Sequence, residues 1–162
     1  MRLLRKEGYK DGVLGKSILK PQSIRMKMDL PKKVENIIDK LEENGFEGFA
    51  VGGCVRDSLL HRKPKDWDIT TNALPKEMKQ IFKKTFDTGI AHGTITVLMD
   101  GEGYELTTYR IDGNYSDGRH PDSVSFSKSL SEDLCRRDFT INAMALDYNG
   151  KLFDYHIKVR RI

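Results

Sequence analysis

The chain has 162 residues, of which 38% are hydrophobic and 32% are charged. This length allows one domain with its own core, and no apolar run approaches the roughly 20 residues that cross a bilayer, so we expect no membrane contact. The N-terminus has no apolar signal segment, and the two cysteines show neither metal spacing nor a disulfide pattern, which favours a reducing, cytoplasmic location.

The positive charge lies mostly at the N-terminus. Residues 1–28 carry a net charge of +6, whereas the rest of the chain carries −2. We interpret residues 1–28 as a basic, flexible extension and residues 29–155 as a globular head domain. A basic arm that helps to hold nucleic acid is the alternative for the extension, and any basic binding surface on the globular part must be local.

The first half of the globular part alternates between helices and strands. Asp29 and Pro31 are typical of a helix start, apolar residues follow at helical spacing from Val34 to Leu41, and Gly45 ends the helix. The apolar run over 46–51 predicts a buried strand. Further patterns predict, in order, a helix over 55–61, a strand over 67–70 and a helix over 74–84.

The second half is richer in β-forming residues. Strands are predicted over 94–99 and 104–110, joined by a turn at 100–103, and over 144–148 and 151–155, joined by Asn149-Gly150. Residues 112–125 are rich in Asp, Gly, Ser and Asn, which predicts a mobile surface loop. Ser129 and Glu132 form a capping-box pattern before a short helix. Together the elements predict an α+β fold, with a small mixed or antiparallel sheet flanked by helices.

The sequence Asp66-Trp67-Asp68 is the strongest candidate for metal binding. Side chains of a strand alternate, so both carboxylates point to one side, and Mg²⁺ prefers oxygen ligands that it shares with substrate phosphates. Glu105, in another β-rich segment, could add a third carboxylate to a two-metal site. The alternative interpretation of all three residues is that they are solvated acidic side chains on strands.

The run Gly52-Gly53-Cys54-Val55-Arg56-Asp57 connects a predicted strand to a predicted helix. Glycines allow a phosphate to approach the backbone closely, and the N–H groups at a helix start favour anions. Arg56 lies one turn into the helix, where it could contact a phosphate, and we interpret Asp57 as a structural partner of N–H groups or Arg. An ordinary strand-to-helix turn is the alternative, and the chain lacks the P-loop pattern G-x-x-x-x-G-K-[ST].

Basic and amide side chains over 136–142 are candidates for nucleotide binding. Arg136 and Arg137 could hold a triphosphate or a ribose, because guanidinium groups suit phosphate oxygens, and Asn142 could hydrogen-bond a sugar or a base. A solvated helix end and a structural turn are the alternatives. The segment Arg119-His120-Pro121-Asp122 could close over a nucleotide or be a solvated loop, and His92 could touch substrate or belong to a turn.

These motifs, in this order, resemble the catalytic head of the class II CCA-adding enzymes and bacterial poly(A) polymerases, members of the DNA polymerase beta nucleotidyltransferase superfamily. The resemblance runs from about residue 30 to residue 154, with family-like spacing. The motifs that carry it are Gly52-Gly53-Cys54-Val55-Arg56-Asp57, Asp66-Trp67-Asp68-Ile69-Thr70, Glu105-Leu106-Thr107-Thr108-Tyr109-Arg110, Arg119-His120-Pro121-Asp122 and Arg136-Arg137-Asp138-Phe139-Thr140-Ile141-Asn142-Ala143.

The resemblance implies a polymerase-beta-like fold, a reaction and residue roles. An RNA 3′-hydroxyl would attack the α-phosphate of CTP or ATP and release pyrophosphate, which adds CCA to a tRNA 3′ end. Asp66 and Asp68 would bind two Mg²⁺ ions, with Glu105 near the hydroxyl. The nucleotide would be bound by Gly52, Gly53, Arg56, Arg136, Arg137, Asp138 and Asn142, and the family's flexible loop would correspond to residues 112–122, including Arg119, His120 and Asp122.

The chain departs from the family near its C-terminal end. Full-length members continue into a neck whose E-D-x-x-R helix pairs with the bases of CTP and ATP, and then into a body and tail that grip tRNA. The family's common Asp-Pro-Phe-Gly-Gly is replaced by Asp154-Tyr155-His156-Ile157, and the chain stops at Ile162. We therefore expect the catalytic head alone, with 156–162 as the start of the neck and an exposed neck-facing surface that promotes self-association.

Three other functions stay open from the residues. A poly(A) polymerase head would carry nearly the same motifs. A non-catalytic remnant would bind nucleotide, or a partner, without transferring it. A minimal nucleotidyltransferase acting on a protein or an antibiotic fits the length, but its usual glycine-serine motif is replaced here by Gly52-Gly53.

Overall fold

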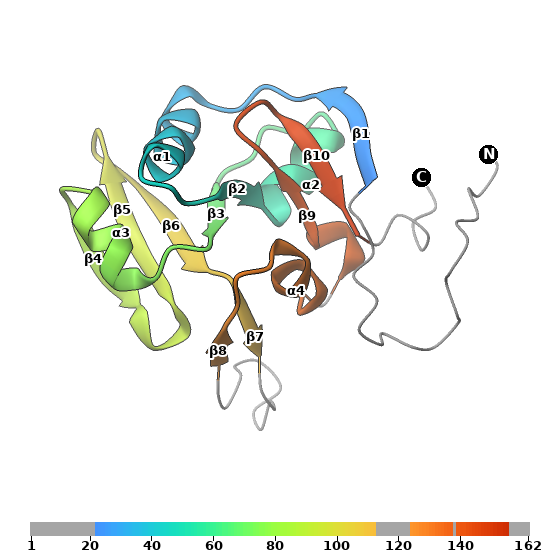
Figure 1. The fold of residues 1–162 in the computed structure, drawn as a ribbon. Helices are drawn as coiled ribbons and strands as arrows, with labels where there is room; N and C mark the ends of the chain where they lie inside the picture. Colours follow the sequence, from blue (N-terminus) through green and yellow to red (C-terminus); the bar gives the residue numbers. More distant parts are fainter. Residues whose placement is uncertain (1–21, 113–123, 138, 156–162) are drawn as a thin grey trace, which may run out of the picture.

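The computed structural model describes residues 22–112, 124–137 and 139–155 of the chain. These residues form an eight-stranded sheet, a two-stranded ribbon and helices packed on the sheet (Figure 1). The elements, in chain order, are β1 (Gln22–Lys27), α1 (Lys32–Glu43), β2 (Gly48–Val51), α2 (Gly53–Leu59), β3 (Asp68–Thr71), α3 (Pro75–Ile81), β4 (Thr85–Gly89), the 3₁₀ turn η1 (Ile90–His92), β5 (Thr94–Met99), β6 (Glu102–Thr108), β7 (Arg110–Asp112), β8 (Val124–Phe126), α4 (Leu130–Cys135), the 3₁₀ turn η2 (Thr140–Asn142), β9 (Met144–Leu146) and β10 (Lys151–Asp154).

The sheet has the strand order β1-β10-β9-β2-β3-β6-β5-β4, so its centre joins segments that are far apart in the sequence. β3 and β6 are parallel, and the other strand pairs of the described residues are antiparallel. A parallel pair requires a crossover connection, which α3, β4 and β5 supply here. The α+β fold with a mixed sheet, predicted from the sequence, is confirmed.

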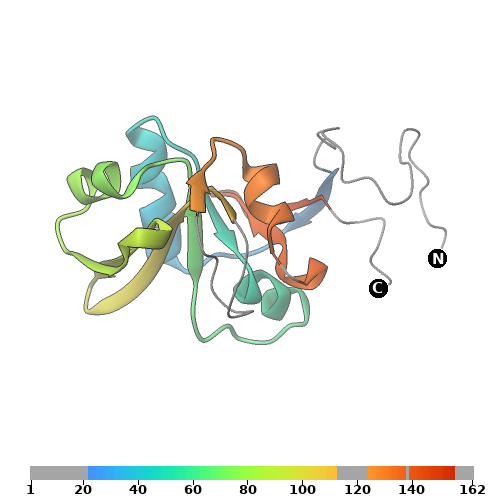
Figure 2. The ribbon, with the colours of Figure 1, turned by 90° about the horizontal axis from the view of Figure 1, so that it is seen from below.

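The two faces of the sheet are covered by different helices. Ala50 of β2 packs in the apolar cluster that contains the buried side of α1, whereas the next residue, Val51, packs with Leu130 and Leu134 of α4. Because successive side chains of a strand point to opposite faces, α1 and α4 lie on opposite sides of the sheet. Figure 2 shows α1 beside α3 and α4 apart from both. No helix in the described part of the chain is long and apolar enough to cross a membrane.

Two helix ends differ from the sequence predictions. α1 starts directly after Pro31, whose backbone is extended, so Asp29 does not cap this helix. α3 ends at Ile81 rather than at residue 84, because Phe82 leaves the helical conformation with ψ 135° and β4 follows. The sequence pattern therefore predicted both helices correctly. The extended backbone next to them determines where α1 begins and where α3 ends.

The predicted capping box before α4 is wrong. Ser129 is the N-cap residue but makes no side-chain capping bond. Glu132 instead accepts a hydrogen bond from the hydroxyl of Ser127, which also accepts one from the backbone N–H of Ser129. The side chain that organises this turn thus comes two residues earlier than the pattern predicted.

The predicted surface loop over 112–125 begins and ends in paired backbone. β6 stops at Thr108, the chain turns at Tyr109, and β7 then pairs with β8 in an antiparallel ribbon. The N–H of Tyr109 donates to the carbonyl of Thr71 at 2.8 Å, which fixes the ribbon to the end of β3. Residues 113–123, including the candidate loop residues Arg119, His120 and Asp122, lie outside the described residues.

The last part of the predicted extension belongs to the sheet. β1, at Gln22–Lys27, pairs antiparallel with β10, although residues 1–28 were expected to be a flexible extension. The physical reason is the outer edge of β10, where backbone N–H and C=O groups gain partners when β1 is added. Residues 1–21 and 156–162 lie outside the described part, so the division of the chain there stays a prediction.

Candidate active site

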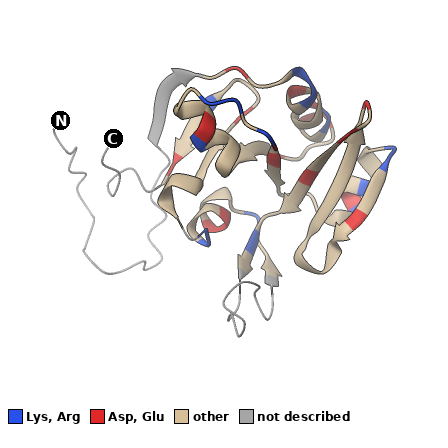
Figure 3. Cartoon of the chain, turned by 180° about the vertical axis from the view of Figure 1, so that it is seen from behind, with Lys and Arg blue, Asp and Glu red and all other residues tan. Residues whose placement is uncertain are grey.

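Two of the predicted catalytic carboxylates are brought together by the sheet. Asp68 is the first residue of β3 and pairs with Glu105 of the parallel strand β6. Directly paired residues point to the same face, and Asp68 also pairs with Val51, whose side chain lies on the α4 face. The two carboxylates therefore lie side by side on the face that carries α4, and Figure 3 shows acidic positions on these neighbouring central strands.

Asp66, the third predicted carboxylate, lines the same cavity as Asp68 and Glu105. A cavity of about 430 Å³ is bounded by Asp66, Trp67, Asp68, Thr96, Gly103 and Glu105. Thr96 belongs to this group because it pairs with Glu105 across β5 and β6. The strand pairing thus collects the D-x-D segment and Glu105, which are 37 or more residues apart in the chain, around one volume.

The electrostatics of this cavity favour a cation. The protein around Asp68 displaces water and raises the pKa of that carboxyl, the charges of Glu105 and Asp66 raise it further, and Arg137 opposes them. Clustered carboxylates repel one another, and a hard divalent ion relieves this repulsion with the oxygen ligands it prefers. Within residues 22–112, 124–137 and 139–155, no three His, Cys, Asp or Glu side chains are already close enough to hold a metal ion. The donor set fits Mg²⁺, but its ligand geometry is not preformed.

The glycine turn at the start of α2 is next to the arginine segment. Gly52 has φ +85°, a left-handed conformation that favours glycine. A Cβ added to Gly52 would lie 3.8 Å from Nη1 of Arg137 and 3.9 Å from the carbonyl oxygen of Asn142. The turn after β2, the residues after α4 and the turn η2 therefore meet at one place.

Arg56 and Asn142, both predicted to bind nucleotide, contact each other directly. Nη1 of Arg56 donates to Oδ1 of Asn142 at 2.9 Å, and Nε donates to Oδ1 of Asp57 at 3.0 Å. This agrees with the interpretation of Asp57 as a structural partner of an arginine. The guanidinium group also folds back over Gly53, where an added Cβ would lie 3.3 Å from Nη2. Arg56 is thus held across the glycine turn.

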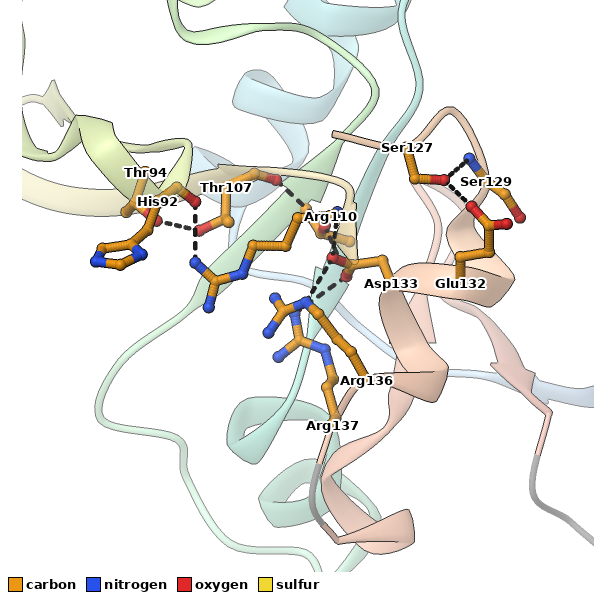
Figure 4. A network of polar contacts seen from close by, with 11 residues as sticks. His92, Thr94, Thr107, Arg110, Ser127, Ser129, Glu132, Asp133, Arg136 and Arg137 are labelled. Carbon is orange, nitrogen blue, oxygen red and sulfur yellow. Dashed lines mark hydrogen bonds and ion pairs between the residues drawn. The ribbon is translucent and has the colours of Figure 1, made fainter. Parts of the chain in front are cut away.

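Arg136 and Arg137 share a buried acid that lies outside the motifs predicted to bind nucleotide. Asp133 of α4 is fully buried and accepts hydrogen bonds from Nε of Arg136 at 3.1 Å and from Nη2 of Arg137 at 3.2 Å. The hydroxyl of Thr70 and the backbone N–H of Arg110 donate to the same carboxylate at 3.0 and 3.3 Å (Figure 4). The spacing of an acid three and four residues before two arginines was the available sequence signal.

Arg137 is suited to bind an anion, because its guanidinium group is buried and keeps an unused N–H donor. Burial lowers the pKa of its guanidinium group, while the charges of Asp133 and Asp68 act in the opposite direction. Its Nε is buried and has no hydrogen-bond partner among the described residues. A buried guanidinium with an unused N–H group beside a glycine turn is chemically suited to a phosphate oxygen.

The remaining candidates are placed as follows. His92 ends η1 and does not line the carboxylate cavity, and its backbone carbonyl accepts a hydrogen bond from Nη1 of Arg110 at 2.9 Å. Cys54 is buried, its thiol donates to the carbonyl of Val51 at 3.3 Å, and loss of solvent raises the pKa of the thiol to about 11. Asp138 lies outside the described residues. The roles of the site residues stay predictions.

Comparison with known families agrees with this geometry. Residues 48–158 match the family model described as the poly(A) polymerase head domain. The chain is 56% identical over 119 residues to the CCA-adding enzyme of Lactobacillus johnsonii, covering 74% of this chain and 30% of the relative. It is 52% identical over 128 residues to the CCA-adding enzyme of Pediococcus pentosaceus, covering 77% of this chain and 32% of the relative. The chain thus spans about a third of the length of these curated relatives.

Solved structures of similar chains share the fold. The crystal structure of the Bacillus stearothermophilus CCA-adding enzyme in complex with CTP is 45% identical, with a TM-score of 0.70 over 76% of this chain and 29% of that one. A tRNA nucleotidyltransferase complexed with a primer tRNA and an incoming ATP analog is 30% identical, with a TM-score of 0.57 over 76% of this chain and 35% of that one.

Proposed function

This chain belongs to the family of poly(A) polymerase head domains, and from that premise we propose that it is the nucleotidyltransferase head of a tRNA CCA-adding enzyme. Its substrates are CTP, ATP and the 3′ end of a tRNA. The names of relatives that are 52–56% identical support CCA addition over poly(A) addition. The observation that carries the proposal is the in-register pairing of Asp68 with Glu105 in a cavity that Asp66 also lines.

Two neighbouring groups of residues, the carboxylates and the arginines, would serve different parts of the reaction. Asp66 and Asp68 would hold Mg²⁺, which, when bound, supplies positive charge for the triphosphate and the attacking oxygen. Glu105 faces the same cavity, where its carboxylate can orient the 3′-hydroxyl. The guanidinium groups of Arg56 and Arg137 bind and orient the phosphates. The 3′-hydroxyl gives up its proton to water, its oxygen forms a bond to the α-phosphorus, the bond from that phosphorus to the bridging oxygen breaks, and pyrophosphate leaves with the electron pair.

Metal-dependent nucleotide binding is the direct test of this assignment. We expect the chain to bind CTP or ATP more tightly with Mg²⁺ than without it, and Asp66→Asn/Asp68→Asn to abolish this difference, because the amide oxygens carry no charge. Trp67 is the only tryptophan and lines the cavity, so its fluorescence or calorimetry reports binding. Asp87→Asn is the matched control, since Asp87 is an exposed acid on the edge strand β4.

The control should bind like the parent chain, because its exposed ion pair with Lys79 contributes little to stability. Equal affinity with and without Mg²⁺ in the parent chain would contradict the proposed function and favour a non-catalytic nucleotide-binding remnant. Poly(A) addition is separated from CCA addition by the product formed on a tRNA that lacks CCA: a run of adenosines from ATP alone would favour the polymerase.

Nucleotide choice and location also belong to the proposal. The described side chains at the site suit phosphate and ribose groups, so we expect this chain alone to bind CTP and ATP with similar affinity and to add CCA poorly unless a neck is supplied. Ordered, efficient CCA addition by the 162 residues would contradict that expectation. A cytoplasmic location stays a prediction.

A further inference from the structure

Asp133 is a fully buried carboxylate on α4, which covers the same face of the sheet as Asp68 and Glu105. It accepts hydrogen bonds from Thr70 on β3, from the first residue of β7, Arg110, and from Arg136 and Arg137 after α4. An ionised carboxylate is costly to bury unless its oxygens are fully satisfied. Here three segments of the chain supply the donors, so the position of each depends on this one residue.

The two arginines use Asp133 differently. Arg136 donates through Nε, at 3.1 Å from Oδ1. Arg137 donates through Nη2, at 3.2 Å from Oδ2, and its own Nε is buried without a hydrogen-bond partner among the described residues. Its Nη1 faces the glycine turn, 3.8 Å from where a Cβ on Gly52 would be. Asp133 therefore holds Arg137 by Nη2 (Figure 4) and leaves Nη1 beside the turn.

The carboxylate of Asp133 also connects Arg137 to β3, the strand that begins with Asp68. Thr70 is two residues after Asp68 on β3, and their side chains share one face. The hydroxyl of Thr70 donates to Oδ2 of Asp133 at 3.0 Å, and Nη2 of Arg137 donates to that same oxygen. One oxygen atom thus fixes the guanidinium group relative to the strand that begins with Asp68.

We propose that Asp133 is a positioning residue, which holds Arg137 by Nη2 so that Nη1 donates to a phosphate of the bound nucleoside triphosphate while Asp68 stays at a fixed place beside it. This inference rests on the proposed function, because it needs a nucleotide in the site. Asp133 itself touches neither the nucleotide nor the reacting atoms, and acts through Arg137.

A substitution that removes the charge of Asp133 distinguishes positioning from simple electrostatics, because the two explanations predict opposite changes in nucleotide affinity. Asp133→Asn removes a negative charge near a site for a triphosphate, and Coulomb attraction alone predicts tighter nucleotide binding. The positioning role predicts the reverse, because asparagine loses the charge that holds the guanidinium group of Arg137, and in either orientation its amide NH₂ group faces a donor of one of the two arginines. We expect CTP with Mg²⁺ to bind about tenfold or more weakly to Asp133→Asn, the effect of losing one hydrogen bond to a charged group.

The experiment is a double-mutant cycle of Asp133→Asn and Arg137→Gln in the full chain, with affinity for CTP and Mg²⁺ measured by Trp67 fluorescence and thermal unfolding followed in parallel. Once Arg137 is replaced, Asp133→Asn should weaken binding no further. Glu132→Gln is the matched control, because it removes one charge from the exposed neighbouring residue of the same helix. It should leave the affinity unchanged within about twofold.

The outcomes are distinct. If Asp133→Asn lowers the melting temperature but binds CTP as the parent does, the residue is only structural and the inference is overturned. Tighter binding, or additive losses in the cycle, also overturns it. If the parent chain shows no Mg²⁺-dependent binding at all, the proposed function fails and this inference fails with it.

A measurement on the unaltered chain covers the case in which Asp133→Asn does not fold. In ¹⁵N NMR spectra of the arginine side chains, addition of CTP and Mg²⁺ should shift the Nε–H signal of Arg137, because the guanidinium group gains a phosphate partner at Nη1. The Nε–H signal of Arg136 should move less, because that group already donates to Asp133. Nucleotide binding with no shift of the Arg137 signal would overturn the inference.

Discussion

Replacing Gly150 tests whether Met28, which follows β1, packs on the turn between β9 and β10. Gly150 has φ +73°, and a Cβ added there would lie 1.9 Å from the carbonyl oxygen of Met28. We expect Gly150→Ala to lower the free energy of unfolding by about 2–5 kcal/mol, since a left-handed alanine costs about 1–2 kcal/mol and the clash forces a backbone shift. Urea unfolding measures the change.

Gly101 provides the matched control for this substitution. It has φ +80° in the turn between β5 and β6, and a Cβ there would meet nothing within 4 Å. Gly101→Ala should therefore cost only the conformational term, about 1–2 kcal/mol. Equal losses for the two variants would show that Met28 does not pack on the Asn149-Gly150 turn, and would return residues 22–28 to the flexible extension that composition predicts.

Residue chemistry was readable from the sequence where it depends on local pattern. Gly52 and Arg56 lie four residues apart, and their strand-to-helix context is visible in the sequence. The role of Asp133 could not be read in that way, because its donors include Thr70 and Arg110, which are 63 and 23 residues away. A buried acid within a charged helix looks like a solvated one until the sheet that covers it is known.

Cys54 lies at the start of α2, directly after the glycine turn, and the reactivity of its thiol reports how rigid this segment is. The thiol is buried, donates to the carbonyl of Val51, and has a pKa raised to about 11 by burial and by the Asp68 charge. At pH 8 only about one such thiol in a thousand is ionised, so iodoacetamide should leave Cys54 almost unmodified in the folded protein.

Cys135 is the internal reference for this alkylation. It lies at the exposed end of α4, and although burial of part of the side chain and Glu132 raise its pKa, reagent can reach it. Mass spectrometry should find Cys135 modified first, and both thiols modified in urea. Equal rates in the folded protein would mean that α2 opens readily, which contradicts a rigid glycine turn.

Strand pairing is the element-level feature that sequence patterns predicted least well. The β-rich character of residues 104–108 was clear, but their parallel pairing with β3 in the register Asp68↔Glu105 follows from the crossover through α3, β4 and β5. β4 itself, TFDTG, has an exposed outer face and few apolar residues, so its sequence alone did not indicate a strand. Its pairing with β5 stabilises it.

At the scale of the whole molecule, the family resemblance predicted more than periodicity did. Periodicity gave the helices and the class of fold, since α1 and the strands of the core have regular apolar spacing. It could not bring Asp66 and Glu105 to one cavity, because that depends on which strands are neighbours in the sheet. The resemblance supplied this placement by descent, and it could not supply Asp133, which lay outside the motifs compared.

The surface around α2 and η2 leads to a prediction about association. Phe139 and Ile141 are 67% and 45% exposed, and Leu60, at the end of α2, is 51% exposed. α2 and η2 are in contact, so these apolar side chains lie on one end of the molecule. Large exposed apolar groups favour association because burying them releases water, and we expect the chain to self-associate through this end. Sedimentation velocity over a wide concentration range should show dimers or larger species.

Two variants locate the contact. Phe139→Ser/Ile141→Ser should shift the sedimentation toward monomer, because it removes the exposed apolar side chains just before η2 and within it and leaves the polar cluster of the site in place. Phe86→Ser is the matched control, since Phe86 is a phenylalanine of similar exposure, 55%, on the edge strand β4. A parent chain that stays monomeric over the whole range would refute the association. Loss of association in the control alone would move the contact to β4, where the outer edge of the sheet offers backbone groups to a second copy.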